Sequence, residues 1–372
     1  MRQARILVVD DEPGMVHAVE RILARRHQVT GSFSAAEAMN IVRTWDPDLA
    51  ILDIRMPEID GFELTARLKA LNPYLDVILM TGSMSNPDQK LIRAIRENAF
   101  YFIQKPFDSE VLRTLVDRCL ELKRLADENR AHVARLEGEL AEAQLFQRSL
   151  LPEMAGQVEG LRLEGRYEPC TELGGDFFDY AAAGPGRVAL LIADVSGHGV
   201  SASMLTGIVK SAFRSCHAEE YRPAAVMERI RNAIQAFEAD RFITVIGAVI
   251  DVRRRRLVYV NAGHPEGLVF GPKRDLLLLE PTGPIISPAF PEFTWDTVSV
   301  DFGPDDRLLL YTDGITEARG PEGFFGDDRL HEVVARHPEG GGPLLDAILA
   351  AVREHSRERP QPDDLTMVTA GG

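Results

Sequence analysis

The stretch FDSEVLRTLVDRCLELKRLADENRAHVARLEGELAEAQLFQRSLL, residues 107–151, is the part of the sequence around which the rest is organised. It contains no proline and lies between Pro106 and Pro152, so it can form one long helix. At alternating spacings of three and four residues, ten of twelve positions are apolar. The twelve are Leu112, Leu115, Cys119, Leu122, Ala126, Asn129, Val133, Leu136, Leu140, Ala143, Gln147 and Leu150.

This heptad seam predicts that the helix pairs with a second helix, because an apolar stripe with a period of 3.5 residues suits a two-helix supercoil. Asn129 within the seam is typical of a polar residue that fixes register and two-strandedness. The alternative is a solvated helix packed on its own domain, but the seam is longer than a globular helix needs. We therefore expect residues 107–151 to be the coiled-coil linker of a homodimer, able to carry a signal between two domains.

The composition predicts a two-domain protein that does not bind nucleic acid. The chain has 372 residues, which suits two domains and a linker. Its net charge of −15 and pI of about 5.1 argue against a nucleic-acid partner. The cysteines, Cys119, Cys170 and Cys216, lack metal-site spacing, which favours a reducing, cytoplasmic location. No apolar run approaches the roughly 18 residues of a membrane span, so no membrane partner is expected.

The first part of the chain alternates short apolar runs with helical patterns. The runs are ILVVD (6–10), QVTGSF (28–33), LAILDI (49–54), VILMT (77–81) and YFIQ (101–104). Nearly continuous apolar strands separated by helices predict an α/β fold with a doubly wound, parallel, five-stranded sheet. Ligands bind such sheets at the carboxyl ends of the strands.

Charged and polar residues follow these runs where a ligand is expected. Asp10 and Asp11 lie at the end of the first run, and Asp53 lies at the end of the third. Thr81 ends the fourth run and Lys105 follows the fifth. Three carboxylates at one edge predict a Mg²⁺ site, and a lysine and a hydroxyl beside them suit a phosphoryl group.

With these residues, the N-terminal part resembles the receiver domain of two-component response regulators, and we assign the domain to residues 1–120. The resemblance implies that Asp53 accepts a phosphoryl group from a sensor histidine kinase. It implies that Mg²⁺ is held by Asp10, Asp11 and Asp53, with the Arg55 backbone carbonyl as a further ligand.

The same resemblance assigns a switching role to three residues. Thr81 would donate a hydrogen bond to the phosphoryl group, and Lys105 would pair with it. Phe102 would be the switching aromatic, although an ordinary core aromatic fits the sequence as well. On phosphorylation the face near Phe102 would repack, and we expect that face to adjoin the last receiver helix.

The remainder, residues 152–372, changes to alternating strand-like runs with a few helical patterns. The runs are RLEGRYEP, VALLIADV, FITVIGAVID, LVYVNAG, WDTVSVDF and RLLLYTDG. They predict an α+β domain with an antiparallel β-sandwich core flanked by helices.

Acidic residues in this second domain lie at the ends of apolar runs or beside glycines. They are Asp176 in LGGDFFDY, Asp194 in LLIADVSGHG, Asp313 in LLLYTDG, and Asp363 and Asp364 in PDDLTMV. Oxygen ligands without histidine or cysteine favour Mg²⁺ or Mn²⁺ over zinc. Without a serine or cysteine nucleophile motif, the set predicts a two-metal site at which water attacks a phosphoryl group.

The strings ADVSGHG, TDGITEA and DDLT, in that order, resemble the PPM-type serine/threonine phosphatases of the bacterial SpoIIE/RsbU-like branch. The resemblance implies that two Mn²⁺ or Mg²⁺ ions are held by the catalytic residues Asp176, Asp194, Asp313 and Asp363, with the Val195 backbone carbonyl. The role of Asp364 stays open. We expect His198 and His264 to hold loops rather than to transfer protons.

Together the two resemblances imply a response regulator whose phosphorylation at Asp53 controls a metal-dependent protein serine/threonine phosphatase. The implied substrate is a phosphorylated STAS-domain anti-sigma-factor antagonist. The alternative is a non-catalytic adaptor with an inactive phosphatase domain, but an inactive domain should have lost acids and this one keeps all four. A DNA-binding regulator is disfavoured because no helix-turn-helix pattern follows the linker.

Overall fold

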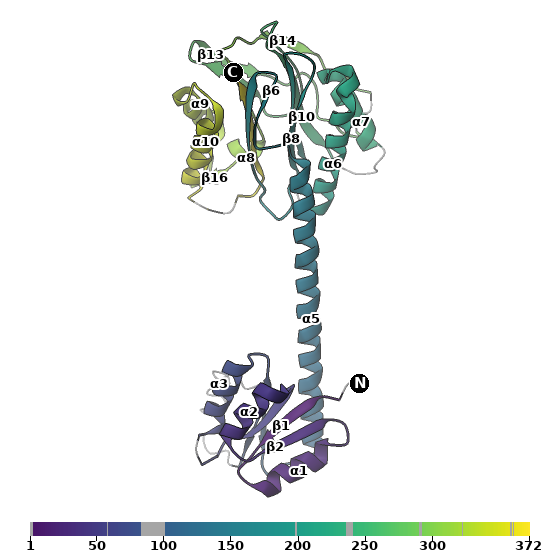
Figure 1. The fold of residues 1–372 in the computed structure, drawn as a ribbon, viewed down its shortest axis with the longest axis vertical. Helices are drawn as coiled ribbons and strands as arrows, with labels where there is room; N and C mark the ends of the chain where they lie inside the picture. Colours follow the sequence, from purple (N-terminus) through teal and green to yellow (C-terminus); the bar gives the residue numbers. More distant parts are fainter. Residues whose placement is uncertain are drawn as a thin grey trace. The chain divides into compact units, whose positions relative to one another are not determined.

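A computed structural model describes most of the chain: residues 3–57, 59–82, 101–197, 199–235, 241–289, 292–321, 323–357, 359 and 361–372. The chain divides into two compact units, Met1–Leu136 and Glu137–Gly372. Figure 1 shows the two units and labels many of their elements. Among the described residues, no helix has both the length and the apolar character needed to cross a membrane.

The first unit is built on one parallel sheet in the order β2-β1-β3-β4-β5. Its strands are β1 (Arg5–Val9), β2 (Gln28–Ser32), β3 (Leu49–Asp53), β4 (Asp76–Thr81) and β5 (Tyr101–Gln104). Its helices are α1 (Pro13–Leu23), α2 (Ala35–Trp45), α3 (Gly61–Leu71) and the first turns of α5 (Ser109–Leu150). The predicted doubly wound receiver fold is confirmed.

The sheet of this unit is covered on both faces because its strands are apolar on both sides. Ile6 and Val8 of β1 lie in one core cluster together with α1 and α5. Leu7 and Val9 lie in the other cluster, which includes residues of α2 and α3. Successive side chains of a strand point to opposite faces, so a continuous apolar run fills both layers.

The second unit contains two sheets, in the orders β14-β11-β10-β9-β8 and β13-β12-β15-β18-β7-β6. Strands of the first sheet are β8 (Asp176–Ala182), β9 (Arg187–Val195), β10 (Ile243–Asp251), β11 (Arg256–Ala262) and β14 (Val298–Asp301). Strands of the second are β6 (Ala155–Val158), β7 (Leu161–Glu168), β12 (Gly267–Gly271), β13 (Arg274–Leu279), β15 (Arg307–Tyr311) and β18 (Leu365–Gly371).

The two sheets share one core, because side chains such as Ile192 and Ile246 of the first pack with Leu310 and Val368 of the second. Helices cover the outer faces, with α6 (Val200–Ser215) and α7 (Pro223–Gln235) on the first sheet. The second sheet is covered by α9 (Gly326–Arg336) and α10 (Gly341–Ser356), as Figure 1 shows. The predicted β-sandwich flanked by helices is confirmed.

The α5 helix shows that the heptad seam is shorter than the sequence predicted. At its start, Leu112 and Cys119 are fully buried in the receiver core. At its end, Gln147 is buried and Leu150 packs against the core of the second unit. The expectation that these seam residues face a partner helix is wrong, since each already packs on its own unit.

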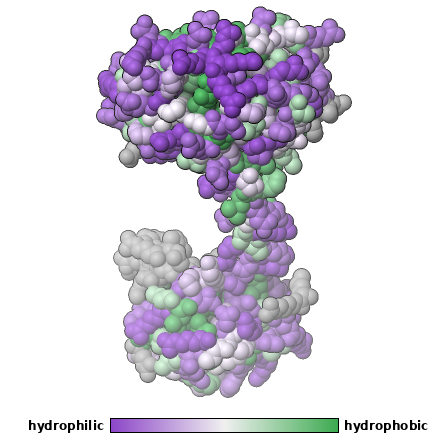
Figure 2. Space-filling model, turned by 45° about the horizontal axis from the view of Figure 1, so that its top comes forward, coloured by the Kyte–Doolittle hydropathy of each residue, from purple (hydrophilic) through white to green (hydrophobic). Residues whose placement is uncertain are grey.

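The middle of α5 keeps an exposed apolar stripe. Val133 and Leu136 are 46% and 52% exposed, and Ala126 and Asn129 are exposed beside them. In Figure 2, hydrophobic residues appear among hydrophilic ones along this helix. The part of the seam that is open to a second copy is therefore the middle, and dimerisation through it stays a prediction.

Candidate functional site

The receiver unit gathers its predicted acids at the carboxyl edge of the sheet. Carboxylate oxygens of Asp10, Asp11 and Asp53 lie within 4.8 Å of one another. The Lys105 ammonium lies 2.6 Å from Asp10 Oδ2 and 2.7 Å from Asp53 Oδ1. The structure thus brings together the four charged residues that the sequence placed at this edge.

Local backbone contacts fix the two buried acids. Asp10 Oδ1 accepts a hydrogen bond from the Glu12 backbone N–H, and Asp53 Oδ2 accepts one from the Arg55 N–H. Burial raises the pKa of Asp10, although its hydrogen bond with Lys105 opposes this rise. Burial alone would lower the pKa of Lys105, but hydrogen bonds to Asp10 and Asp53 outweigh it and raise the pKa. Three carboxylates with one ammonium leave excess negative charge, which fits a hard divalent cation.

The predicted switch residues Thr81 and Phe102 lie on the neighbouring strands β4 and β5. Thr81 is buried at the end of β4. The Phe102 ring is partly buried, 6.4 Å from the Phe62 ring, in the layer formed with α2 and α3. Its neighbour Ile103 faces the opposite layer, where α5 packs. The expectation that the face near Phe102 adjoins the last receiver helix is therefore wrong, because adjacent strand residues point to opposite faces.

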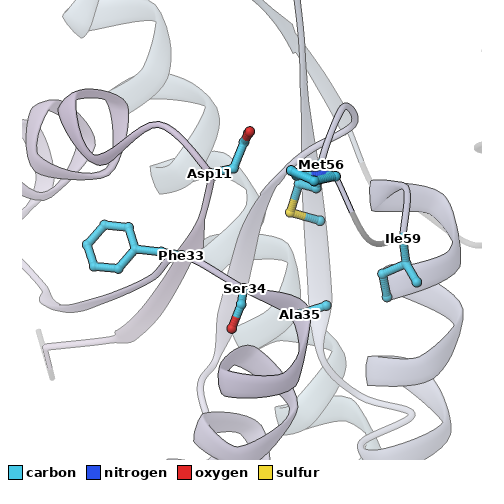
Figure 3. Close-up of a pocket in the computed structure, with 7 residues that line it drawn as sticks. Asp11, Phe33, Ser34, Ala35, Met56 and Ile59 are labelled. Carbon is cyan, nitrogen blue, oxygen red and sulfur yellow. The ribbon is translucent and has the colours of Figure 1, made fainter.

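A small pocket opens beside Asp11, between the segments that follow β1, β2 and β3 (Figure 3). Its lining is largely apolar: Phe33, Ser34, Ala35, Met56, Pro57 and Ile59 complete it. The volume of about 90 Å³ is far below that of a pocket for an organic ligand, roughly 300–1,000 Å³. This pocket is therefore too small for an organic cofactor, and Asp11 is the one acid of the receiver site among its lining residues.

In the second unit, the acids come from four separate segments. Asp176 begins β8 and lies directly opposite Asp194 of β9 in the antiparallel register. Asp313 begins the short helix α8 (Asp313–Thr316), which follows β15. Asp363 and Asp364 precede β18, which pairs with β15.

Asp176, Asp194, Asp313 and Asp363, called the cluster below, are linked by electrostatic effects on their pKa values. Burial raises the pKa of Asp194 to about 7, with further contributions from Asp313, Asp363 and Asp364. Burial and then Asp363 raise the pKa of Asp313 to about 6. The pKa of Asp176 is raised well above its usual value by burial, Asp194 and Asp364.

The cluster fits divalent cations by its charge and by its donor atoms. In the described part of the chain, no lysine or arginine forms an ion pair within 4.0 Å of Asp176, Asp194 or Asp313. Buried carboxylates without a counter-charge are costly, and a bound cation removes that cost. Because the candidate donors are carboxylate oxygens, the ions of choice are Mg²⁺ or Mn²⁺.

Cys170 lies close to this cluster but does not suit a metal. Its sulfur and oxygens of Asp363 and Asp364 lie within 4.8 Å of one another. Burial raises the pKa of the Cys170 thiol to about 12, with Asp364 as the next cause. Because thiolate is the ligating form, the protonated thiol is a poor ligand.

The structure gives Asp364 a role that the sequence left open. Its side chain is buried and accepts backbone hydrogen bonds from Cys170, Gly175 and Asp176, at 2.8, 2.6 and 3.2 Å. Asp363 is exposed instead. Asp364 therefore holds the backbone that leads into Asp176, whereas Asp363 accepts a 2.9 Å hydrogen bond from the Asp364 N–H through its Oδ1.

Thr312 is a residue of this site that sequence reasoning missed. Its hydroxyl is fully buried, donates a 2.7 Å hydrogen bond to Asp176 Oδ2 and accepts one from the Thr366 N–H. It thereby orients the Asp176 carboxylate. The available signal was its place immediately before Asp313 in the TDG string.

The predicted backbone ligand Val195 lies beside the loop that carries Asp176. A Cβ atom on Gly175 would lie 2.6 Å from the Val195 carbonyl oxygen and 2.7 Å from that of Gly197. Only glycine permits this approach of two backbone segments. That the Val195 carbonyl binds an ion stays a prediction.

Of the two histidines expected to hold loops, the structure describes His264. His264 is fully buried, its Nδ1 lies 2.8 Å from the Thr244 hydroxyl, and burial lowers its pKa to about 3. A neutral, enclosed imidazole agrees with the expected loop-holding role. His198 lies outside the described residues.

Comparisons with known families match both units. Residues 184–371, about half of the chain, match the family "Stage II sporulation protein E (SpoIIE)". Residues 6–117 match the family "Response regulator receiver domain". The first match includes Asp194, Asp313 and Asp363, and the second includes Asp10 and Asp53.

Individual relatives agree with these matches. Protein IcfG of Synechocystis is 28% identical over 273 residues, covering 66% of this chain and 43% of IcfG. Phosphoserine phosphatase RsbP of Bacillus subtilis is 28% identical over 210 residues, covering 55% of this chain and 50% of RsbP. The chain thus spans about half the length of the curated relatives it matches. The solved SiaA-PP2C domain of Pseudomonas aeruginosa superposes with a TM-score of 0.56 at 23% identity, covering 64% of this chain and 98% of that one, which shows a shared fold.

Proposed function

The chain belongs to the SpoIIE family of PPM-type phosphatase domains, here preceded by a response regulator receiver domain, and we propose that phosphorylation of Asp53 controls its metal-dependent protein serine/threonine phosphatase activity. The observation that supports catalysis is the group of buried acids Asp176, Asp194 and Asp313, whose pKa values are raised and which form no ion pair with a lysine or arginine in the described part of the chain. A non-catalytic adaptor would have no use for these three uncompensated acids.

Two Mn²⁺ or Mg²⁺ ions would be held by Asp176, Asp194, Asp313 and Asp363, with the Val195 carbonyl. When bound, such ions supply Lewis acidity that activates a water molecule and neutralises the phosphoryl oxygens. The chain's own residues prepare the site: Thr312 orients the Asp176 carboxylate, and Asp364 holds the preceding backbone.

The proposed partners follow from the two units. A sensor histidine kinase would phosphorylate Asp53 in the presence of Mg²⁺ held by Asp10, Asp11 and the Arg55 carbonyl. The substrate would be a serine-phosphorylated STAS-domain anti-sigma-factor antagonist, in keeping with the similarity to a phosphoserine phosphatase. We place the receiver at residues 1–120, the linker at 107–151 and the phosphatase at 152–372, with a cytoplasmic homodimer formed through the linker.

Phosphate release from a serine-phosphorylated STAS protein tests this function. With Mn²⁺ we expect stoichiometric release, and beryllofluoride, which mimics the phosphoryl group on Asp53, should increase the rate several-fold. The chain with Asp53→Asn should keep the basal rate and lose the response. If no phosphorylated STAS protein of the source organism releases phosphate, although the chain binds Mn²⁺, the adaptor interpretation replaces this one.

A second expected result concerns Thr312. Thr312→Val keeps the shape of the side chain but removes the donor to Asp176 and the acceptor for Thr366, and a hydrogen bond to a charged group contributes about 1.5–3 kcal/mol. We expect the turnover at limiting Mn²⁺ to fall about tenfold to a hundredfold. Thr312→Ser, which keeps the hydroxyl, should stay near the parent rate, and equal losses in both variants would contradict the assigned role.

A further inference from the structure

A row of polar side chains crosses the edge of the first sheet of the second unit. In the antiparallel register, Asp194 of β9 lies opposite Asp176 of β8 on one side and opposite Thr244 of β10 on the other. Ile192 and Ile246, each two residues away along its strand, lie in the core between the two sheets. Because side chains two apart on a strand share a face, Asp194 and Thr244 also face the space between the sheets.

Thr244 brings a hydroxyl group within reach of the Asp194 carboxylate. Directly opposite residues of an antiparallel pair have Cβ atoms about 4.5–5.5 Å apart. At that separation the two side chains can be joined by a direct hydrogen bond or by one bridging water. Thr244 is only partly buried, so water has access to it.

The Thr244 hydroxyl is held from another side by a buried histidine. His264 is 2% exposed, and its Nδ1 lies 2.8 Å from Thr244 Oγ1. The backbone N–H of His264 donates a 2.8 Å hydrogen bond to Asn261 Oδ1, which fixes the residue. The direction of the Thr244 hydroxyl hydrogen therefore depends on which ring nitrogen of His264 carries a proton.

The surroundings of the ring decide where this proton lies. Burial lowers the pKa of His264 to about 3, so the imidazole is neutral at pH 7 and carries one N–H. Nε2 has no hydrogen-bond partner in the described part of the chain, although the Tyr311 backbone contributes to the pKa of the ring. Because a buried N–H without an acceptor is costly, the proton belongs on Nδ1, where Thr244 Oγ1 accepts it. The hydroxyl hydrogen of Thr244 is then available to Asp194.

We propose that Thr244 is a positioning residue of the phosphatase site, whose hydroxyl, oriented by the Nδ1–H of His264, donates a hydrogen bond to the Asp194 carboxylate directly or through one water. The inference rests on the proposed function only in taking Asp194 as a metal ligand. Thr312 has the same relation to Asp176 within this site, since its hydroxyl donates to that carboxylate. A hydrogen bond to a ligating carboxylate fixes its direction, and its loss typically lowers metal affinity about tenfold to a hundredfold.

The first measurement determines the tautomer of His264 in the metal-free full chain. With nitrogen-15 in the histidine rings, the nitrogen chemical shifts distinguish Nδ1–H from Nε2–H, and the variant His264→Leu identifies the signal by its loss. We expect the proton on Nδ1. A proton on Nε2 would turn the Thr244 hydroxyl toward the ring and would overturn the inference.

The second measurement compares Mn²⁺ binding in Thr244→Val, Thr244→Ser and Thr369→Val. All are made in the full chain carrying Asp11→Ala, which removes a predicted ligand from the receiver site. Thr244→Val keeps the shape of the side chain and removes the hydroxyl, whereas Thr244→Ser keeps the hydroxyl. Thr369→Val makes the same change in β18, at a buried hydroxyl that has no hydrogen-bond partner in the described residues. Calorimetry gives the Mn²⁺ affinity, and hydrolysis of p-nitrophenyl phosphate gives kcat and KM.

We expect Thr244→Val to bind Mn²⁺ about tenfold or more weakly than Thr369→Val, with a matching fall of kcat at limiting Mn²⁺ and an unchanged KM. Thr244→Ser should stay within about threefold of the parent. A difference below fivefold between the two valine variants, or equal losses in Thr244→Val and Thr244→Ser, overturns the inference. If Thr244→Val does not fold, Thr244→Ala supplies the same comparison.

His264→Leu tests whether the histidine acts through the hydroxyl. In the parent it should weaken Mn²⁺ binding. In the Thr244→Val chain it should weaken binding no further, because apolar replacement of both partners leaves no polar atom of this pair unpaired. No loss in the parent, or an equal loss in both chains, overturns the role of His264.

The outcomes separate this inference from the proposed function. Weakened Mn²⁺ binding by Thr244→Val, in a chain that hydrolyses no phosphoserine protein, supports the inference and overturns only the proposed function. Unchanged Mn²⁺ binding by that variant overturns the inference and leaves the phosphatase in place. A parent chain that binds no Mn²⁺ at the second unit overturns both.

Discussion

Asp194→Asn is expected to lower the turnover of a phosphoserine substrate by roughly a hundredfold to a thousandfold, the usual loss when a main stabilising group of a transition state is removed. Asp194 lies opposite Asp176, and the negative charges of Asp313 and Asp363 act on its carboxylate. It is therefore central to the cluster. An amide there removes one negative charge and one strong oxygen ligand. Phosphate release at saturating Mn²⁺ measures the effect.

A matched control is Asp275→Asn, which makes the same chemical change at an exposed position of β13. It should leave the turnover within about twofold of the parent. The interpretation fails if Asp194→Asn retains full activity, or if the parent is fully active in a strong chelator.

Asp194→Asn, which should lower the turnover, should raise the stability of the metal-free protein. Because burial raises the pKa of Asp194 to about 7, the folded state binds this proton more tightly than the unfolded chain does. The acid therefore destabilises the fold above pH 7, and the stability is recovered as the pH falls through 7 toward 4. In chelator at pH 8, Asp194→Asn should raise the thermal midpoint by a few degrees, given about 2–4 °C per kcal/mol in a domain of this size.

Ala134→Pro, in the exposed middle of α5, is expected to abolish the response of the phosphatase to beryllofluoride at Asp53. Proline removes a backbone donor and disrupts the helix at a cost of about 3 kcal/mol or more. Ala134 is exposed, so the change spares the buried contacts at both ends of the helix. Since coupling energies of about 1–3 kcal/mol correspond to 5- to 150-fold effects, the whole of such a response should be lost.

Ala134→Lys is the control, because lysine is a good helix former at an exposed position. It should retain the response, and both variants should keep the basal Mn²⁺-dependent rate. If the proline variant responds to beryllofluoride as the parent does, α5 does not carry the signal.

The two sites differ in how much of their arrangement could be predicted from the sequence. In the receiver, each site residue follows its own apolar strand, and parallel strands bring their carboxyl ends to one edge, so Asp10, Asp53 and Lys105 could be placed together beforehand. The face on which Phe102 packs was misjudged, because the short run YFIQ has no strict alternation of polar and apolar residues that would tell one face from the other. Thr312 was missed because its partner Asp176 is 136 positions away.

For the long helix α5 too, the sequence predicted the local structure but not the packing. Its apolar period determined by itself that residues 109–150 are helical, because a stripe at spacings of three and four is consistent only with a helix. The period does not say which surface the stripe meets. Only the tertiary structure decided that Leu112 belongs to the receiver core and Gln147 to the phosphatase loop. From the sequence alone the acids at the strand ends could be picked out as the predicted site residues, since residue type and strand ends are local. Which backbone each polar side chain holds depends on segments that meet only when the chain is folded.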